Sequence, residues 1–197
     1  TLPELLGPGA WKAASAEARE IGLDLAPMTP FEPWYAAVVV TQLRLAQLGF
    51  DPSLGVESRL AADAQRLGKE IRGLETLESQ LGALDSLSAD AQREFLQSTL
   101  EEAGEVGEMA DDMIAAWKAG DVRALDADLL GSVREQPEVY RALIVRRNEH
   151  FANAIGDLVN GRKNYLIVIG ALHLVGPDSV LRMLERQGVA SRQIGGG

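Results

Sequence analysis

The chain has 197 residues, of which 46% are hydrophobic and 24% are charged, and it contains no cysteine. This composition is typical of a globular domain with one sizeable core, and the lack of cysteine excludes a disulfide framework, a thiol nucleophile and a cysteine-based metal site. The net charge of −10 would repel phosphate backbones, so we expect no nucleic-acid partner.

Helical patterns dominate the first two thirds of the sequence. The longest apolar stretch runs from Trp34 to Phe50, but it is interrupted by Gln42, Arg44 and Gln47, and it is too short and polar for a membrane span. We interpret it as a buried helix of the core. Glycines end several patterns, as expected at helix C-termini. The predicted helices cover residues 10–21, 34–49, 56–67 and 77–84, and a longer region, 88–130, that is broken near Gly104 and Gly120.

The last third mixes helical and strand-like patterns. Residues 139–159 form an amphipathic helical pattern, and the apolar, β-branched run Tyr165 to Ile169 predicts a strand covered on both faces. Gly176-Pro177-Asp178 predicts a helix start, since proline suits the first helical position. Residues 69–74 and 188–194 are further candidate strands.

These elements predict a helix-rich α/β domain over residues 1–194, with a small, mostly parallel sheet under packed helices and a tail at 195–197. In a sheet of so few strands, the backbone N–H and C=O groups along the edges have no neighbouring strand to pair with. Either a segment or partner outside this chain completes the sheet, or helices cap the edges of a small sheet. The start at Thr1-Leu-Pro favours the first alternative and suggests a truncated chain.

Two residues are candidate metal ligands. His173 follows the predicted strand 165–169, and Glu75 follows the predicted strand 69–74, so parallel strands would bring both to one sheet edge. A carboxylate and an imidazole there can bind a divalent metal and activate a coordinated water. Two alternatives stay open: His173 is a loop histidine satisfied by backbone groups, and Glu75 caps the next helix. The other histidine, His150, is better explained by helix packing or surface exposure.

Arg147 and Asn148 lie on the predicted helix before the 165–169 strand. An arginine near a metal site can hold a substrate carboxylate or an oxyanion, and an asparagine can orient a substrate amide. Arg-Asn pairs are also common on helix surfaces. The acidic pairs at Glu101 and at Asp111 are interpreted as solvated helix faces.

Four segments of the sequence match a known family pattern: Gly55-Val-Glu57, Gly73-Leu-Glu-Thr76 with Gln80, Arg147-Asn148 and Gly170-Ala-Leu-His-Leu-Val-Gly176. With these segments the sequence resembles the TraB/PrgY/GumN family, which is similar to the Tiki metalloproteases. The resemblance implies an α/β fold of two sequence halves, each giving a GxxH histidine and a glutamate to a shared metal-dependent peptidase site. It assigns His173 to the second GxxH motif, Glu75 to the second-half glutamate, and Arg147 and Asn148 to a polar pair near the site.

The chain departs from this family pattern in two places. It lacks the first GxxH motif with its glutamate, and Glu57 stands where an aspartate is usual. The first departure implies that this chain alone is inactive and that an N-terminal segment or partner chain completes the site.

We therefore predict a metal-dependent, peptidase-like hydrolase, with His173 and Glu75 as half of a metal site and a peptide as substrate. The family resemblance further implies a bacterial protein of the cell envelope or periplasm, or a secreted one. A noncatalytic module that binds or sequesters a peptide in the same cleft is the first alternative. A helical interaction domain with a purely structural GxxH motif is the second.

Overall fold

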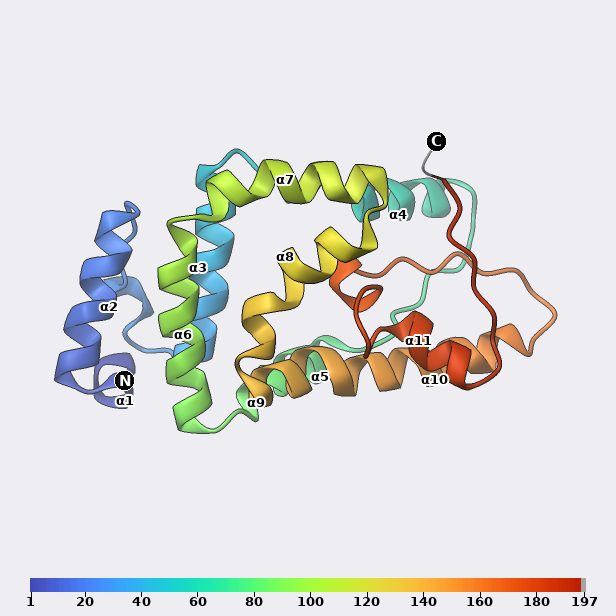
Figure 1. Cartoon of the computed structure of the whole chain (residues 1–197). Helices are drawn as coiled ribbons and strands as arrows, with labels where there is room; N and C mark the ends of the chain where they lie inside the picture. Colours follow the sequence, from blue (N-terminus) through green and yellow to red (C-terminus); the bar gives the residue numbers. More distant parts are fainter. Residues whose placement is uncertain (196–197) are drawn as a thin grey trace.

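A computed structural model describes residues 1–195, and within this range the chain folds into helices and connecting segments without a strand (Figure 1). The α-helices are α1 (Leu2–Leu6), α2 (Pro8–Glu20), α3 (Pro33–Gln47), α4 (Val56–Arg66), α5 (Leu77–Asp85), α6 (Ala89–Ala103), α7 (Val106–Ala119), α8 (Val122–Arg134), α9 (Pro137–Tyr140), α10 (Arg146–Val159) and α11 (Val180–Arg186). The short helical turns are η1 (Ala26–Met28), η2 (Pro52–Leu54), η3 (Arg141–Val145) and η4 (Ala171–His173).

The N-terminal part of the molecule is organised around α3 and α6, which pack side by side with α1 and α2 beyond them (Figure 1). The buried side chains of α3 include Ala36, Ala37 and Val40, and small side chains let helices approach closely. Leu96 and Leu100 of α6 complete this cluster from the other side. Burial of apolar area is therefore what holds this part together.

The C-terminal part contains a nearly continuous rod formed by α9, η3 and α10, with α11 lying on α10 (Figure 1). The turn η3 is a π-helical segment, so the rod is wider there than an ordinary α-helix. Phe151, Ala152 and Ile155 of α10 pack against Val180, Met183 and Leu184 of α11. This second core supports the segment that carries His173.

The predicted sheet is wrong, because all three candidate strands are irregular segments in the structure. Ile167 and Ile169 turn inward onto the α10–α11 core, whereas Leu166 and Val168 are exposed. Leu74 and Val189, from the other two segments, pack onto the same core. Each segment is thus held by side-chain contact with the helices, and no backbone ladder forms among residues 1–195. The fold of the described chain is all-helical, and the predicted α/β class is corrected accordingly.

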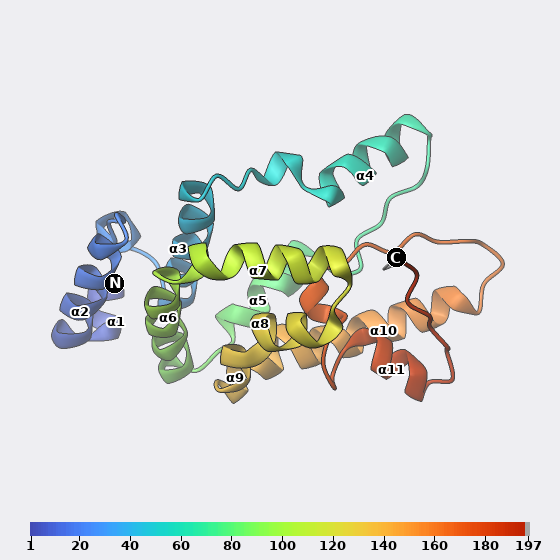
Figure 2. The same cartoon turned by 45° about the horizontal axis from the view of Figure 1, so that its top comes forward.

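Two smaller findings concern helix placement. The last helix begins at Val180 and not at Pro177, since the hydroxyl of Ser179 accepts from the Arg182 amide as its cap. The helix α4 has no buried residue and stands apart from the other helices (Figure 2).

Within residues 1–195, no helix combines the length and the hydropathy that crossing a membrane requires.

Candidate functional site

His173 lies at the end of η4, in the connection between residues 165–169 and α11. Its side chain is 4% exposed. The imidazole meets the ring of Phe151 edge to face, with 5.3 Å between ring centroids and an interplanar angle of 78°. The predicted loop position is confirmed, although the element before the loop is not a strand. The histidine is thus held by α10 and has little freedom to turn.

A hydrogen-bond chain fixes the orientation of the His173 ring. Asn148 is fully buried, and its Nδ2 donates to the backbone carbonyl of Asp178 at 2.7 Å. Its Oδ1 therefore faces Nδ1 of His173, 2.6 Å away. Because an amide oxygen can only accept, Nδ1 carries the hydrogen. In the neutral ring, Nε2 is then left with a lone pair, and it has no hydrogen-bond partner among the described residues.

The protonated form of His173 is disfavoured by its surroundings. Burial lowers the pKa of His173 from 6.5 to about 4, and the positive charge of Arg147 acts in the same direction, while Glu75 opposes it. His173 is consequently a neutral base near pH 7. Its Nε2 can accept a proton or bind a metal ion.

Glu75 and Arg147 form an ion pair beside this histidine. Nε of Arg147 donates to Oε2 of Glu75 at 3.1 Å, and Nη2 donates to Oε1 in a second, shorter contact. The Arg147 and Glu75 side chains are only 17% and 14% exposed. The Arg147 guanidinium also lies 5.6 Å from the centre of the Phe151 ring, whose edge-to-face partner is His173. The structure thus brings together all four predicted site residues.

One alternative for Glu75 is settled by this geometry. The cap of α5 is Thr76, whose hydroxyl accepts from the Ser79 amide at 3.1 Å. Glu75 therefore pairs with Arg147 and does not cap the helix.

The helix α10 sets the positions of these side chains. Arg147 and Phe151 are four residues apart and share one face of the helix, while Asn148 precedes Phe151 by three residues. The π-helical turn η3 ends at Val145, directly before this stretch. Such turns occur often at functional sites, because the extra residue changes which side chains face the interior.

A pocket of about 250 Å³ opens next to Glu75, between α5 and α10. Ser79, Gly82 and Ala83 of α5 form one wall, and Arg146, Arg147 and His150 of α10 contribute to the other. His150 is exposed, and its Nε2 lies 2.9 Å from the carbonyl of Leu74. This contact agrees with the packing or surface role predicted for it.

A second pocket, of about 240 Å³, lies beside the turn that carries His173. Its lining is apolar and consists of Met113, Ile114, Trp117, Leu125, Leu129 and Ala171. Ala171 belongs to η4, so this pocket adjoins the histidine turn.

A catalytic metal ion needs more donor side chains than this site supplies. Catalytic zinc has three protein ligands as a rule, whereas His173 and Glu75 supply two, and both carboxylate oxygens of Glu75 are bound by Arg147. No group of three or more histidine, aspartate or glutamate side chains suited to a metal occurs in the described part of the chain. These residues alone therefore do not fit a complete metal site.

Two parts of the network were missed by sequence reasoning. Asp178 holds Asn148 through its backbone carbonyl, and its Oδ2 accepts from the Tyr140 hydroxyl at 3.0 Å. Asp178 was interpreted as a helix start, and no sequence signal linked it to Tyr140 or Asn148. Conversely, Glu57 lies on α4, apart from the site (Figure 2). Gln80 lies on α5, and its side chain is exposed.

Comparison with known proteins identifies relatives over most of the chain. It is 25% identical over 183 residues to metalloprotease TIKI2 of Danio rerio, covering 79% of this chain and 35% of that protein. It is 24% identical over 168 residues to YbaP of Escherichia coli, an uncharacterized protein, covering 85% of this chain and 62% of YbaP. YbaP of Shigella flexneri gives the same values.

The chain thus spans about one third of TIKI2 and less than two thirds of YbaP. No solved structure matches it. The family model of TraB/PrgY/gumN matches residues 1–193, nearly the entire sequence. The chain belongs to the TraB/PrgY/gumN family.

Proposed function

We propose that this chain is part of a hydrolase that cleaves peptide bonds. Membership of the TraB/PrgY/gumN family and the similarity to a metalloprotease support this reaction class. The observation that carries the proposal is the buried, neutral His173, with Nδ1 bound to Asn148 and the Nε2 lone pair unused. Such a nitrogen is what a general base or a metal ligand requires.

The four site residues take different roles in this proposal. His173 offers Nε2 to the reacting groups. Asn148 acts through His173, because its amide is buried and both of its polar atoms are already bound. Glu75 and Arg147 line the pocket between α5 and α10, where Arg147 can share its guanidinium with a substrate carbonyl or carboxylate. The apolar pocket beside Ala171 would take an apolar side chain of a peptide.

We further propose that the cleavage depends on a divalent metal ion, which the similarity to the metalloprotease TIKI2 supports. A bound divalent ion would supply a water of lowered pKa. His173 and Glu75 would provide part of its ligand set, with Glu75 released from Arg147. The remaining ligands would come from a further N-terminal segment or a partner chain. Secretion, or residence in a bacterial cell envelope or periplasm, remains a prediction that cell fractionation tests.

The test is peptide cleavage by the chain alone and by a longer protein that includes any preceding segment, with zinc or manganese added or chelated. His173→Ala should lower the rate by about 100-fold or more, the usual contribution of a general base. Glu149→Ala is the control, since Glu149 is an exposed residue of α10 that lines neither pocket, and it should retain the rate. Full activity of His173→Ala would overturn the proposal.

A noncatalytic peptide-binding module is the second candidate. The observation in its favour is that Arg147 donates hydrogen bonds to both carboxylate oxygens of Glu75, so this carboxylate is already paired. A binder needs neither a free carboxylate nor a full ligand set. Peptide binding that persists in His173→Ala, together with no cleavage by any form of the protein, would establish this candidate.

A further inference from the structure

The pocket between α5 and α10 is lined mostly by basic side chains where it is charged, although the chain as a whole is acidic. Three basic side chains line it, namely Arg146, Arg147 and His150, against one acid, Glu75. Since Glu75 and Arg147 form an ion pair with each other, Arg146 supplies the remaining positive charge of the lining. The whole chain carries a net charge of −10, so this positive lining is a local feature of the pocket.

Arg146 is free to bind a ligand. It is exposed, and none of the ion pairs among the described side chains includes it. Glu138 is near enough for Arg146 to contribute to its lowered pKa, but its carboxylate is bound to the amide and hydroxyl of Ser88, at 2.6 and 2.8 Å. An arginine fork without a partner matches the two oxygens of a carboxylate.

The size of the pocket limits the ligand. A volume of about 250 Å³ corresponds to about eight water molecules, which is below the range of pockets for drug-sized molecules. Gly82 and Ala83 leave this space open on the α5 side. The pocket therefore suits a group of about one amino-acid residue, and the polar side chains of Ser79 and His150 lie on its wall.

We infer that this pocket is a carboxylate-binding subsite, in which Arg146 holds the carboxylate of one residue of a peptide. The inference rests on the proposed function for its ligand, because it specifies which peptides the hydrolase takes. The carboxylate belongs to a C-terminal residue or to an aspartate or glutamate side chain. Glu75 and Arg147 border the same pocket, so a peptide bound there lies next to the candidate site.

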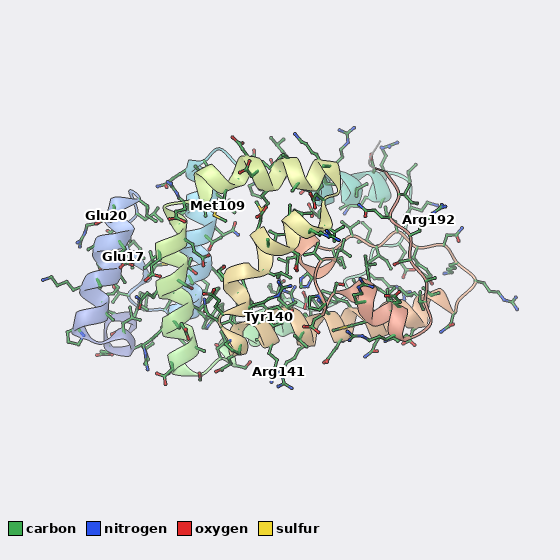
Figure 3. The ribbon with its side chains drawn as sticks, in the orientation of Figure 1. Glu17, Glu20, Met109, Tyr140, Arg141 and Arg192 are labelled. Carbon is green, nitrogen blue, oxygen red and sulfur yellow. The ribbon has the colours of Figure 1, made fainter. Side chains whose placement is uncertain are left out.

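The test uses N-acetylglycine as the carboxylate probe and N-acetylglycinamide as its neutral match, each titrated into the full chain and followed by NMR. N-acetylglycine should bind, and Arg146→Gln should weaken its binding about tenfold or more, as expected for the loss of a charge-assisted hydrogen bond. Arg141→Gln is the control, since Arg141 is exposed and points away from the fold (Figure 3). It should change binding by less than about twofold. Equal binding of acid and amide, or unchanged binding in Arg146→Gln, would overturn the inference.

Two peptides identify the source of the carboxylate. One is an acetylated trialanine with a free C-terminus, and the other is an amidated peptide with a single internal aspartate. Arg146-dependent binding of either supports the subsite, and binding of neither overturns it. Bound peptide that the longer protein leaves uncleaved with zinc or manganese present would refute the proposed hydrolase alone. Equal cleavage of acidic and neutral peptides would refute the subsite alone.

Discussion

The two ends of the molecule bury different kinds of side chains. The core shared by α1, α2, α3 and α6 consists of apolar residues, with Leu96 and Val40 among the most buried. The region of α10, η4 and α11 buries Asn148, His173 and Ser179 alongside its apolar core. Apolar packing stabilises without further conditions, whereas each buried polar group costs free energy unless it is hydrogen-bonded. Ser15 of α2 and Gln92 of α6 are buried as well, but in the second region the buried side chains of Asn148 and His173 form one hydrogen-bonded chain.

This contrast separates a packing region from a candidate site region. In the second region Asn148 binds His173 and the carbonyl of Asp178, and Arg147 binds Glu75, while Nε2 of His173 has no partner among the described residues. Mutations in the first region should change stability and leave the state of His173 unchanged. Mutations in the second should change both.

The largest effect is expected from Leu96→Ala in the apolar core. Leu96 is almost fully buried, and its truncation leaves a cavity, which should lower the free energy of unfolding by about 4 kcal/mol. Urea unfolding measures this loss, and Leu67→Ala, at an exposed leucine, should cost within about 0.5 kcal/mol. The NMR shifts of the His173 ring in folded Leu96→Ala should equal those of the unmodified chain. A changed ring state would contradict the separation of the two regions.

Asn148→Ala should cost about 3 kcal/mol, because it leaves the Nδ1–H of His173 and the carbonyl of Asp178 buried without a partner. Asn153→Ala, on the exposed side of the same helix, is the matched control and should cost about 0.5 kcal/mol or less. The measurement is urea unfolding, combined with the His173 ring shifts. A cost equal to that of the control would show that the network does not hold the histidine.

The stability of the chain should depend on pH through His173. Its pKa in the folded chain is about 4, below the ordinary value of 6.5, so the unfolded chain binds more protons between these values. Stability from this group is complete above pH 6.5 and is lost as the pH falls towards 4, by about 3 kcal/mol in all. Urea unfolding at several pH values measures the slope. His173→Gln should remove this part of it, and an unchanged slope would contradict the burial argument.

Glu75→Gln is expected to have the smallest effect, about 2 kcal/mol, because it leaves the mostly buried Arg147 without its counter-charge. The matched control is Glu70→Gln, which breaks an exposed ion pair with Arg72 and should cost about 0.5 kcal/mol or less. Thermal unfolding compares the two variants. Equal losses would mean that the Glu75–Arg147 pair behaves as an ordinary surface pair.

Much of the helical structure was predictable from sequence because its signals are local. The apolar stretch from Trp34 and the helical region predicted from residue 88 correspond to the observed α3 and to α6, and Gly120 ends α7 as predicted. The strand predicted for residues 165–169 is wrong because an apolar, β-branched segment can pack against helices as well as within a sheet. Here Ile167 and Ile169 find that partner in two helices instead of a sheet.

The members of the candidate site were also predictable, but their pairing was not. Glu75, Arg147, Asn148 and His173 were each singled out from motifs. The contacts of Arg147 with Glu75 and of Asn148 with His173 join residues 72 and 25 positions apart, and no local pattern specifies such pairs. The sequence therefore singled out the residues of this network, and the structure shows that Asn148 binds His173 and the carbonyl of Asp178.

The most direct test of this account is the tautomer of His173, measured by ¹⁵N NMR on the folded chain between pH 5 and 8. The account predicts a neutral ring throughout, with the hydrogen on Nδ1 and a lone pair on Nε2. A ring with its hydrogen on Nε2, or one that becomes protonated near pH 6.5, would contradict the claim that Asn148 and burial prepare His173 as a base or metal ligand.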